Sequence, residues 1–198
     1  MTKGEDTKEA ILRQAALVFN RRGFFGAALS DVMDVTGLEK GGIYNHFKSK
    51  EDLALQAFDY AVGLLRQEFG RAVRDQRDAM GRLQGIIAVF ERQAEGHPLP
   101  GGCPVMNTAI EADDTHPALR ERARQAMDEW HDFVRRVVRR GQEKGEIKPA
   151  VDPEMFSSVL ISTMEGAVMQ SKLYGNPEPV QRAVAYLTGY LEKELRAG

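Results

Sequence analysis

The chain has 198 residues, of which 42% are hydrophobic and 28% are charged, and its formal net charge is −2 at pH 7. A chain of this length buries about 70% of its extended surface, so its fold needs no disulfide or metal to hold it together. The single cysteine, Cys103, excludes an intrachain disulfide and suits a reducing compartment. No run approaches the roughly 18 apolar residues that span a bilayer, and the first ten residues lack the apolar core of a signal peptide. We therefore expect a cytoplasmic protein with no membrane partner.

The first predicted helix covers residues 7–22 and stops at Gly23. Its apolar residues recur at helical spacing; they are Ile11, Leu12, Ala15, Ala16, Val18 and Phe19. Two short helices follow, separated by a turn at Gly37, where a residue tolerant of positive φ is favoured. In the first of these, Leu29, Val32 and Met33 repeat the inward-facing spacing.

The second short helix combines a polar stripe with an apolar one. Positions four apart nearly overlap around a helix, so Lys40, Tyr44 and Lys48 share one side. Ile43 and Phe47 form a separate inward stripe. The layout is typical of a recognition helix that lies in a DNA groove and grips a small core. A plain helical hairpin is the alternative that periodicity alone leaves open.

Residues 8–53 resemble the DNA-binding head of the TetR family of one-component repressors. The resemblance rests on the run T-G-L-E-K-G-G-I-Y-N-H-F-K-S-K-E-D-L at residues 36–53 and on F-N-R-R-G-F-F at residues 19–25. It implies that Tyr44 and His46 contact phosphates and that residues 39, 40 and 45 approach bases. Ala28 stands where the family often has a capping hydroxyl residue, so one helix cap is missing. The expected DNA-binding residues are Ser30, Glu39, Lys40, Gly41, Gly42, Tyr44, Asn45, His46, Lys48 and Lys50.

The remaining sequence predicts helices to the end of the chain. The capping-box variant S-x-x-D at residues 49–52 opens a long helix that runs to about Asp75, and another covers residues 78–94. Four later helices begin with a cap-like residue before a proline, which suits the first helical position; these prolines are Pro104, Pro117, Pro153 and Pro177. We predict an all-α fold of about nine helices, with a DNA-binding domain at residues 1–49 and a helical effector-binding and dimerisation domain at residues 50–198. Residues 1–50 hold eight basic and six acidic residues, a net +2, and residues 51–198 hold 19 and 23, a net −4. This distribution fits a protein that meets DNA at one end.

The last two predicted helices carry information about self-association. The helix at residues 155–174 is apolar on more than one face, so it must be covered on both sides. A fully internal helix in a monomer is one interpretation. We favour a two-fold homodimer, because a helix-turn-helix protein reads two half-sites and the TetR resemblance implies the same. The expected dimerisation residues are Val159, Ile161, Met169, Val184, Leu187, Tyr190 and Leu191.

The C-terminal domain is the expected sensor for a small, largely apolar effector. By resemblance this part diverges within the family, so the candidates come from apolar residues with a few polar anchors among them. They are Cys103, Met106, Asn107, Ile110, Trp130, Phe133, Val137, Met164, Glu165 and Val168. Cys103 stands at a predicted helix N-terminus, which favours the thiolate, and its segment loosely resembles that of electrophile-responsive family members. A thiol-based sensor and an inert buried cysteine both remain open.

An enzyme is a less favoured interpretation, because the sequence has no recognisable catalytic constellation. The four histidines lack metal-ligand spacing, and Gly41-Gly42 lacks the lysine pattern of a phosphate-binding loop. We therefore expect no catalytic residue, no metal site and no cofactor. A structural helical adaptor would leave the first fifty residues unexplained. The expected partners are double-stranded operator DNA, a small-molecule effector and a second copy of the chain.

Overall fold

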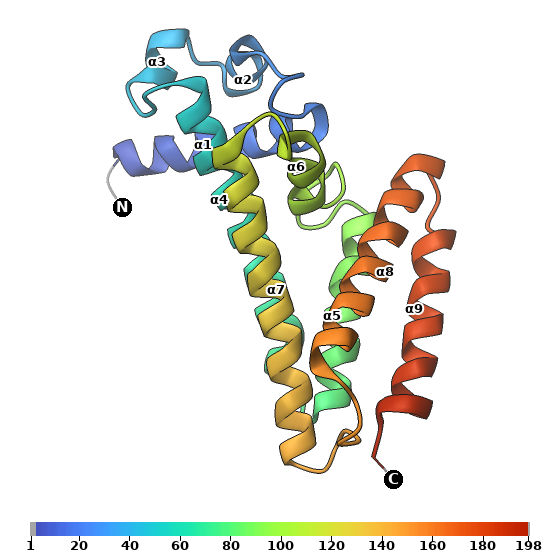
Figure 1. Ribbon diagram of the computed structural model, residues 1–198. Coiled ribbons are helices and arrows are strands. Elements are labelled where there is room, and N and C mark those ends of the chain that lie inside the picture. The colour runs from blue at the N-terminus through green and yellow to red at the C-terminus, as the bar shows by residue number, and fades with distance from the viewer. Residues whose placement is uncertain (1–2, 198) are drawn as a thin grey trace. The chain divides into compact units, whose positions relative to one another are not determined.

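The computed structural model describes residues 3–197, and all the regular secondary structure within them is helical (Figure 1). The elements in chain order are α1 (Lys3–Arg22), α2 (Leu29–Thr36), α3 (Lys40–Tyr44), α4 (Lys50–Arg74), α5 (Ala79–Ala94), α6 (Pro104–Ala112), α7 (Pro117–Glu143), α8 (Pro153–Tyr174), α9 (Glu178–Tyr190) and a π-helical turn at Leu191–Leu195. The prediction of an all-α chain with about nine helices is confirmed. Between residues 3 and 197 the only β-type pairing is an isolated bridge between Ile147 and Arg196.

The chain divides into two compact units. The first holds Met1–Leu64 and Leu99–Gln125, and the second holds Leu65–Pro98 and Ala126–Gly198. Each unit thus combines two separate stretches of sequence, because α4 and α7 each contribute residues to both. The functional division predicted at residues 49 and 50 concerns activity rather than compactness, and it stays a prediction.

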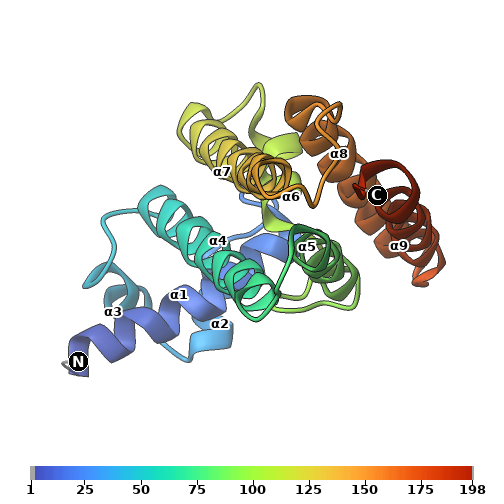
Figure 2. The same cartoon turned by 90° about the horizontal axis from the view of Figure 1, so that it is seen from below.

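The first unit is built on the apolar face of α1. Helix α1 packs against α2 and α6, and α2 packs against α3 (Figure 2). The buried residues of this cluster are Ile11, Ala15, Ala16, Val18, Ala27, Val32, Ile43, Phe47, Leu53, Ala57, Ala61 and Leu99. The inward stripes expected from the sequence at α1, α2 and α3 therefore meet in one small core.

The second unit is held together by α5, α8 and α9, which pack against one another pairwise. An aromatic cluster fills its interior: the ring centroids of Phe69 and Phe90, and of Phe69 and Trp130, lie 5.5 Å apart, and those of Phe90 and Trp130 lie 5.7 Å apart. All three pairs meet edge to face, the arrangement that aromatic quadrupoles favour. No helix among residues 3–197 is long and apolar enough to cross a membrane.

The helix starts follow the capping chemistry that the sequence predicts. The Asp152 carboxylate accepts the Glu154 N–H at 2.8 Å ahead of Pro153, and the Asp78 carboxylate accepts the Gly81 N–H at 2.7 Å. Helix α9 begins at Glu178, one residue after the expected proline, and the Asn176 side chain accepts the Glu178 N–H at 3.0 Å. Because each cap satisfies an otherwise unpaired N–H group, the positions of these starts are encoded locally.

Candidate nucleic-acid interface and effector region

Helices α2 and α3 form a helix-turn-helix whose turn is made by Gly37. Gly37 adopts a left-handed conformation with φ of 66°, and its N–H donates to the Met33 carbonyl at 2.8 Å. Beyond the turn, Ile43 and Phe47 are 0% and 2% exposed, so they fix the second helix to the core of the first unit. The outer side of this second helix is thereby presented on a rigid support.

The second helix is shorter than its sequence pattern suggests. Helix α3 ends at Tyr44, and the Phe47 N–H returns to the Ile43 carbonyl at 3.2 Å to close the segment that follows. Lys48 therefore lies outside the helix, and the prediction of one continuous stripe from Lys40 to Lys48 is wrong in this respect. The reason is that the backbone at Lys48 bonds to the start of α4 instead of continuing α3. The Lys48 N–H donates to the Asp52 carboxylate at 2.8 Å.

The S-x-x-D capping box predicted at α4 forms its forward bond, while its reverse bond reaches the residue before the N-cap. The Asp52 N–H donates to the Ser49 hydroxyl at 3.0 Å, while the Asp52 carboxylate accepts the Lys48 N–H. The bond from the Lys48 N–H is the largest cause that lowers the pKa of Asp52. The tight turn between α3 and α4 is thus held by charge-assisted hydrogen bonds.

The predicted DNA-binding residues are mostly exposed. Tyr44 is 40% exposed, and the Lys40 ammonium lies 5.7 Å from the centroid of its ring. Seven of the ten predicted residues are exposed and three are half-buried. The exposed ones are Ser30, Glu39, Lys40, Gly41, Tyr44, Asn45 and Lys48; the half-buried ones are Gly42, His46 and Lys50. Their contacts with DNA stay a prediction.

Lys50 is engaged within the protein. Its ammonium donates to the Phe24 carbonyl at 2.6 Å and lies 4.4 Å from the centroid of the Phe24 ring. Gly41 shows the opposite situation, because a Cβ atom added there would meet nothing within 4 Å. Crowding within the described structure therefore does not require glycine at position 41, and the predicted approach of a phosphate remains a reason for it.

The missing hydroxyl at Ala28 is partly replaced by Asp31. The Asp31 carboxylate accepts the Ala28 N–H at 2.7 Å, which is the reverse half of a capping box, and it also pairs with Arg22. The hydrogen bond from Ala28 is the largest cause that lowers the pKa of Asp31. Helix α2 begins at Leu29, directly after Ala28, which is its N-cap residue.

Cys103 is the N-cap residue of α6, as the sequence predicts, but its side chain is 0% exposed. The neighbouring Gly102 is also buried. The other candidates on α6 differ in exposure, since Met106 and Asn107 are half-buried and Ile110 is 67% exposed. A thiol sensor at Cys103 is therefore not favoured by its burial.

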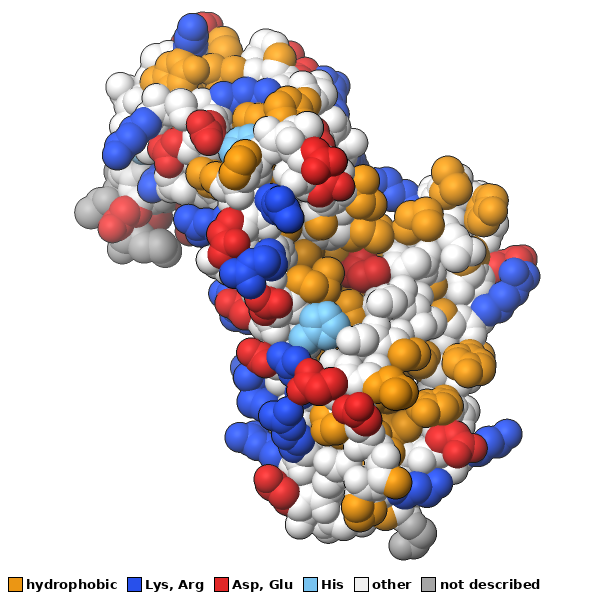
Figure 3. Space-filling view, in the orientation of Figure 1, with side chains coloured by type: hydrophobic (Ala, Val, Ile, Leu, Met, Phe, Trp, Pro, Cys, Tyr) orange, Lys and Arg blue, Asp and Glu red, His pale blue; other side chains and the backbone are white. Residues whose placement is uncertain are grey.

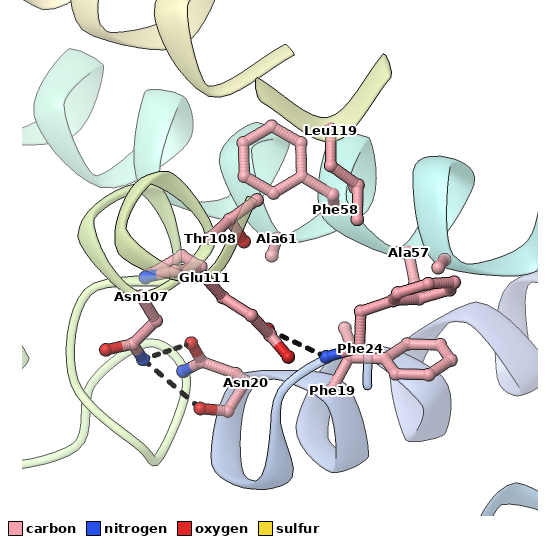
Figure 4. Close-up of a pocket in the computed structure, with 13 residues that line it drawn as sticks. Phe19, Asn20, Phe24, Ala57, Phe58, Ala61, Asn107, Thr108, Glu111 and Leu119 are labelled. Atoms are coloured by element: carbon pink, nitrogen blue, oxygen red, sulfur yellow. Dashed lines mark hydrogen bonds between the residues drawn. The ribbon is translucent and has the colours of Figure 1, made fainter. Parts of the chain in front are cut away.

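A cavity of about 30 Å³ lies within the first unit and contains only one of the predicted effector residues, Asn107 (Figure 4). Phe19 and Phe24 of the N-terminal segment, Phe58 of α4 and Leu119 of α7 give it apolar walls. Asn20, Asn107, Thr108 and Glu111 add polar atoms along one side. This volume is enough for about two water molecules, since one requires roughly 10–15 Å³ on the same measure.

The remaining effector candidates belong to the second unit and are largely buried. Trp130 and Phe133 line an apolar gap of about 10 Å³. The other candidates in this unit are buried; they are Val137, Met164, Glu165 and Val168. No pocket described within either unit collects the whole predicted set, so its role as one effector site stays a prediction.

Gln93 is a candidate that sequence reasoning missed. It follows Phe90 by about one turn of α5 and is 2% exposed, and within residues 3–197 neither its side-chain nitrogen nor its oxygen has a hydrogen-bond partner. Such a buried amide is rare in native proteins, because leaving it unpaired costs free energy. Its only sequence signal is a polar residue within the apolar spacing of α5, which also occurs at satisfied core positions.

Helices α8 and α9 expose an apolar face. Figure 3 shows hydrophobic side chains gathered over these two helices. Their exposed large hydrophobic residues are Met155, Val159, Met169, Leu173, Tyr174, Tyr186 and Tyr190. Of the predicted dimerisation residues, Ile161, Leu187 and Leu191 are instead at most 3% exposed within their own unit. A surface patch of this kind is typical of a protein–protein contact.

A helix-turn-helix fixed to a buried core places this protein in the class of DNA-binding transcriptional regulators. Comparison with known families specifies it further. Residues 11–57 match the family described as bacterial regulatory proteins, tetR family, and residues 79–187 match the tetracyclin repressor-like C-terminal domain. The second match covers more than half of the chain. The protein belongs to the TetR family, as its sequence motif implies.

Similar proteins support this assignment along the whole chain. A TetR transcriptional regulator from Chloroflexus aurantiacus is 45% identical, with a TM-score of 0.96 and 100% of both chains covered. A TetR-family regulator from Cytophaga hutchinsonii is 30% identical, with a TM-score of 0.92, covering 100% of this chain and 98% of that one. The repressor DhaR of Mycobacterium sp. is 25% identical over 176 residues, which is 88% of this chain and 87% of DhaR.

Proposed function

We propose that this protein is a repressor that binds a palindromic operator as a homodimer and leaves it when a small molecule binds. The observation that carries the proposal is the helix-turn-helix, which is anchored to the buried core of the first unit. Its outer side exposes four polar residues, Lys40, Tyr44, Asn45 and Lys48. Amines, a phenol and an amide on such a support supply both phosphate and base-edge contacts. A regulator that acts on chromosomal DNA works in the cytoplasm, and we propose that location.

Dimerisation follows from the exposed face of α8 and α9. A groove of about 580 Å³ lies between the two helices, and Met155, Val159, Tyr186 and Tyr190 are among its lining residues. The rings of Tyr186 and Tyr190 are nearly parallel with centroids 6.5 Å apart, and both are exposed, so they add aromatic surface to this face. A two-fold partner that covers this face would bring two recognition helices to two half-sites of a palindrome.

Release by an effector requires two states of the protein with different affinities for the ligand. A molecule that binds both states equally shifts nothing, however tightly it binds. Within the second unit, the buried Gln93 amide is unpaired among the described residues and lies on α5 beside the apolar residues of that helix, and an apolar surround with a few polar groups is the composition of a small-molecule site. We propose a small, largely apolar effector with at least one hydrogen-bonding group.

The test begins with a DNA duplex that the wild-type protein selects from a randomised library. Binding is followed by fluorescence anisotropy at several salt concentrations, and the stoichiometry is measured by sedimentation. We expect two protomers per duplex and an affinity that falls steeply with salt, because phosphate contacts release counterions. Selection of a single, non-repeated half-site by a monomer would contradict the proposal.

Effector release is tested separately with a panel of small apolar compounds that differ in one hydrogen-bonding group. The compound that raises the thermal midpoint of the free protein should also weaken its binding to the selected duplex. A bound compound that leaves DNA affinity unchanged would show that DNA binding is not effector-controlled by that route. The DNA-binding part of the proposal would stand in that case.

A further inference from the structure

We propose that Glu111 is a positioning residue that ties α6 to the turn between α1 and α2 and so sets the placement of the helix-turn-helix. All the groups involved lie in the first compact unit. Glu111 is the penultimate residue of α6, and it is 87 residues from Phe24 in the sequence. Its role is distinct from DNA contact, because it acts through the backbone of the turn.

The Glu111 carboxylate holds two successive N–H groups. One oxygen accepts the Phe24 N–H at 2.8 Å (Figure 4). The other oxygen accepts the Phe25 N–H at 2.9 Å. Hydrogen bonds to an ionised carboxylate are about twice as strong as those between neutral groups. A fork of two such bonds fixes both the position and the orientation of the peptide units that it holds.

Gly23 makes this close approach possible. Its φ of +75° lies in the left-handed region, and a Cβ atom there would lie 2.5 Å from one Glu111 oxygen and 2.7 Å from the other. No other atom is as near to that position. Glycine at residue 23 therefore serves two needs, the turn that ends α1 and the space that the carboxylate occupies.

The same turn is held from its other side by α4. The Phe24 carbonyl, next to the N–H that Glu111 holds, accepts the Lys50 ammonium at 2.6 Å. From Phe25 the chain runs through three small residues to Leu29, where α2 begins. Since so short a connection follows the fork, a displacement of Glu111 relative to α1 moves the start of the helix-turn-helix.

A second connection between α6 and α1 lies one helical turn earlier. Asn107 donates to the Asn20 backbone carbonyl at 3.2 Å, to the Asn20 side-chain oxygen at 2.9 Å and to the Gly101 carbonyl at 3.0 Å. The Asn20 side chain in turn donates to the carbonyls of Pro100 and Gly102, both at 3.0 Å. Residues 107 and 111 are four apart, so they share one face of α6.

The cavity of about 30 Å³ beside this face gives α6 room to move. Thr108 and Glu111 line it from α6, and Ala57, Phe58 and Ala61 line it from α4. A packed interface without such space resists small displacements. Movement of α6 in response to a ligand would thus reach the α1–α2 turn directly through Glu111, in addition to any movement carried by α4.

The test compares Glu111→Ala and Glu111→Gln with the control Asp113→Ala. Asp113 is an exposed carboxylate two residues further on, and its side-chain oxygen accepts the N–H of the adjacent Asp114 at 2.9 Å. The control therefore removes the same charge nearby without touching the turn. Hydrogen exchange at the Phe24 and Phe25 amides reports the fork, and anisotropy with a duplex selected by the wild-type protein reports DNA binding.

We expect Glu111→Ala to speed exchange at both amides and to weaken DNA binding by roughly 5- to 150-fold, the range typical of coupling between sites. Glu111→Gln retains one acceptor oxygen and should lie between alanine and wild type. The slope of log affinity against log salt should stay unchanged, because no phosphate contact is lost. Asp113→Ala should match wild type in every measurement.

Two results would overturn the proposal directly, and a third would pass the decision to the Glu111→Gln variant. Rapid exchange of the Phe24 and Phe25 amides in the wild-type protein would show that the fork does not form. Faster exchange in Glu111→Ala with DNA affinity within about twofold of wild type would show that the fork is only structural. Loss of protection throughout α1 and α2 would mean that the variant unfolds the head, and Glu111→Gln then decides: unchanged affinity with one amide released rejects the proposal.

Discussion

Replacing Gln93 with methionine should stabilise the protein, which is the opposite of what most substitutions in a buried core do. Gln93 is 2% exposed, and both polar atoms of its side chain lack a hydrogen-bond partner among residues 3–197. Methionine is unbranched, similar in length and adaptable in packing, so the change removes the unpaired polar atoms and leaves no large cavity.

The magnitude follows from the cost of an unpaired buried group. Each such donor or acceptor costs about 1–3 kcal/mol, and part of this is recovered when the group is removed. For a protein of this size, 1 kcal/mol shifts the unfolding midpoint by about 2–4 °C. We therefore expect Gln93→Met to raise the midpoint by roughly 2 to 12 °C.

The assay is thermal unfolding followed by circular dichroism, with protein concentration held constant because self-association also affects the midpoint. The matched control is Gln84→Met on the same helix, where the side chain is exposed and the change should stay within about 0.5 kcal/mol. A Gln93→Met variant with a lower midpoint than wild type would refute the reasoning, because it would mean that the amide makes stabilising hydrogen bonds.

Four further outcomes are expected, three at the predicted interfaces and one at the start of α2. Tyr44→Ala should weaken binding to all DNA sequences about equally, and Lys48→Ala should reduce the salt slope by about 0.9 if it contacts one phosphate; unchanged binding in gel shifts would contradict both. Val159→Asp should yield monomers in sedimentation, because it places a charge in the exposed apolar face. The Asp31 pKa is lowered in the folded state, so its cap on the Ala28 N–H is present above the pKa of an unfolded aspartate and is lost as pH falls through the folded pKa. Exchange at that amide should speed up in acid, and Asp31→Asn should remove the pH dependence.

The helix-turn-helix and the start of α4 could be predicted from the sequence because the residues that determine them are close together in the chain. The glycine turn at residue 37, the capping box at Ser49 and Asp52, and the buried pair Ile43 and Phe47 all act within a few residues of one another. Such signals are visible in a linear string of letters. The length of α3 was misjudged because the same string permits two outcomes, continuation of the helix through Lys48 or an early start of the cap on α4.

The contacts that unite distant segments could not be predicted in the same way. Glu111 reaches Phe24 across 87 residues, and no spacing rule pairs a carboxylate on one helix with backbone groups of a remote turn. The burial of a side chain could not be predicted from the local sequence either. Cys103 stands between a glycine and a proline, residues typical of exposed loops, yet its side chain is 0% exposed. Tertiary packing decides such cases, and the local pattern does not report it.

The exposed face of α8, which we propose as a dimer contact, shows that residues with the same apolar character in a periodic pattern can differ in burial. On α8, Val159 and Ile161 are both apolar and two positions apart, but they are 51% and 3% exposed. Two positions correspond to about 200° around a helix, so one faces outward whenever the other faces the core. A helix that is apolar nearly all round therefore serves two contacts at once, and only the outward half is available to a second copy of the chain. On this reasoning Met155, Val159, Met169 and Leu173 on α8, rather than Ile161, would form the contact between protomers.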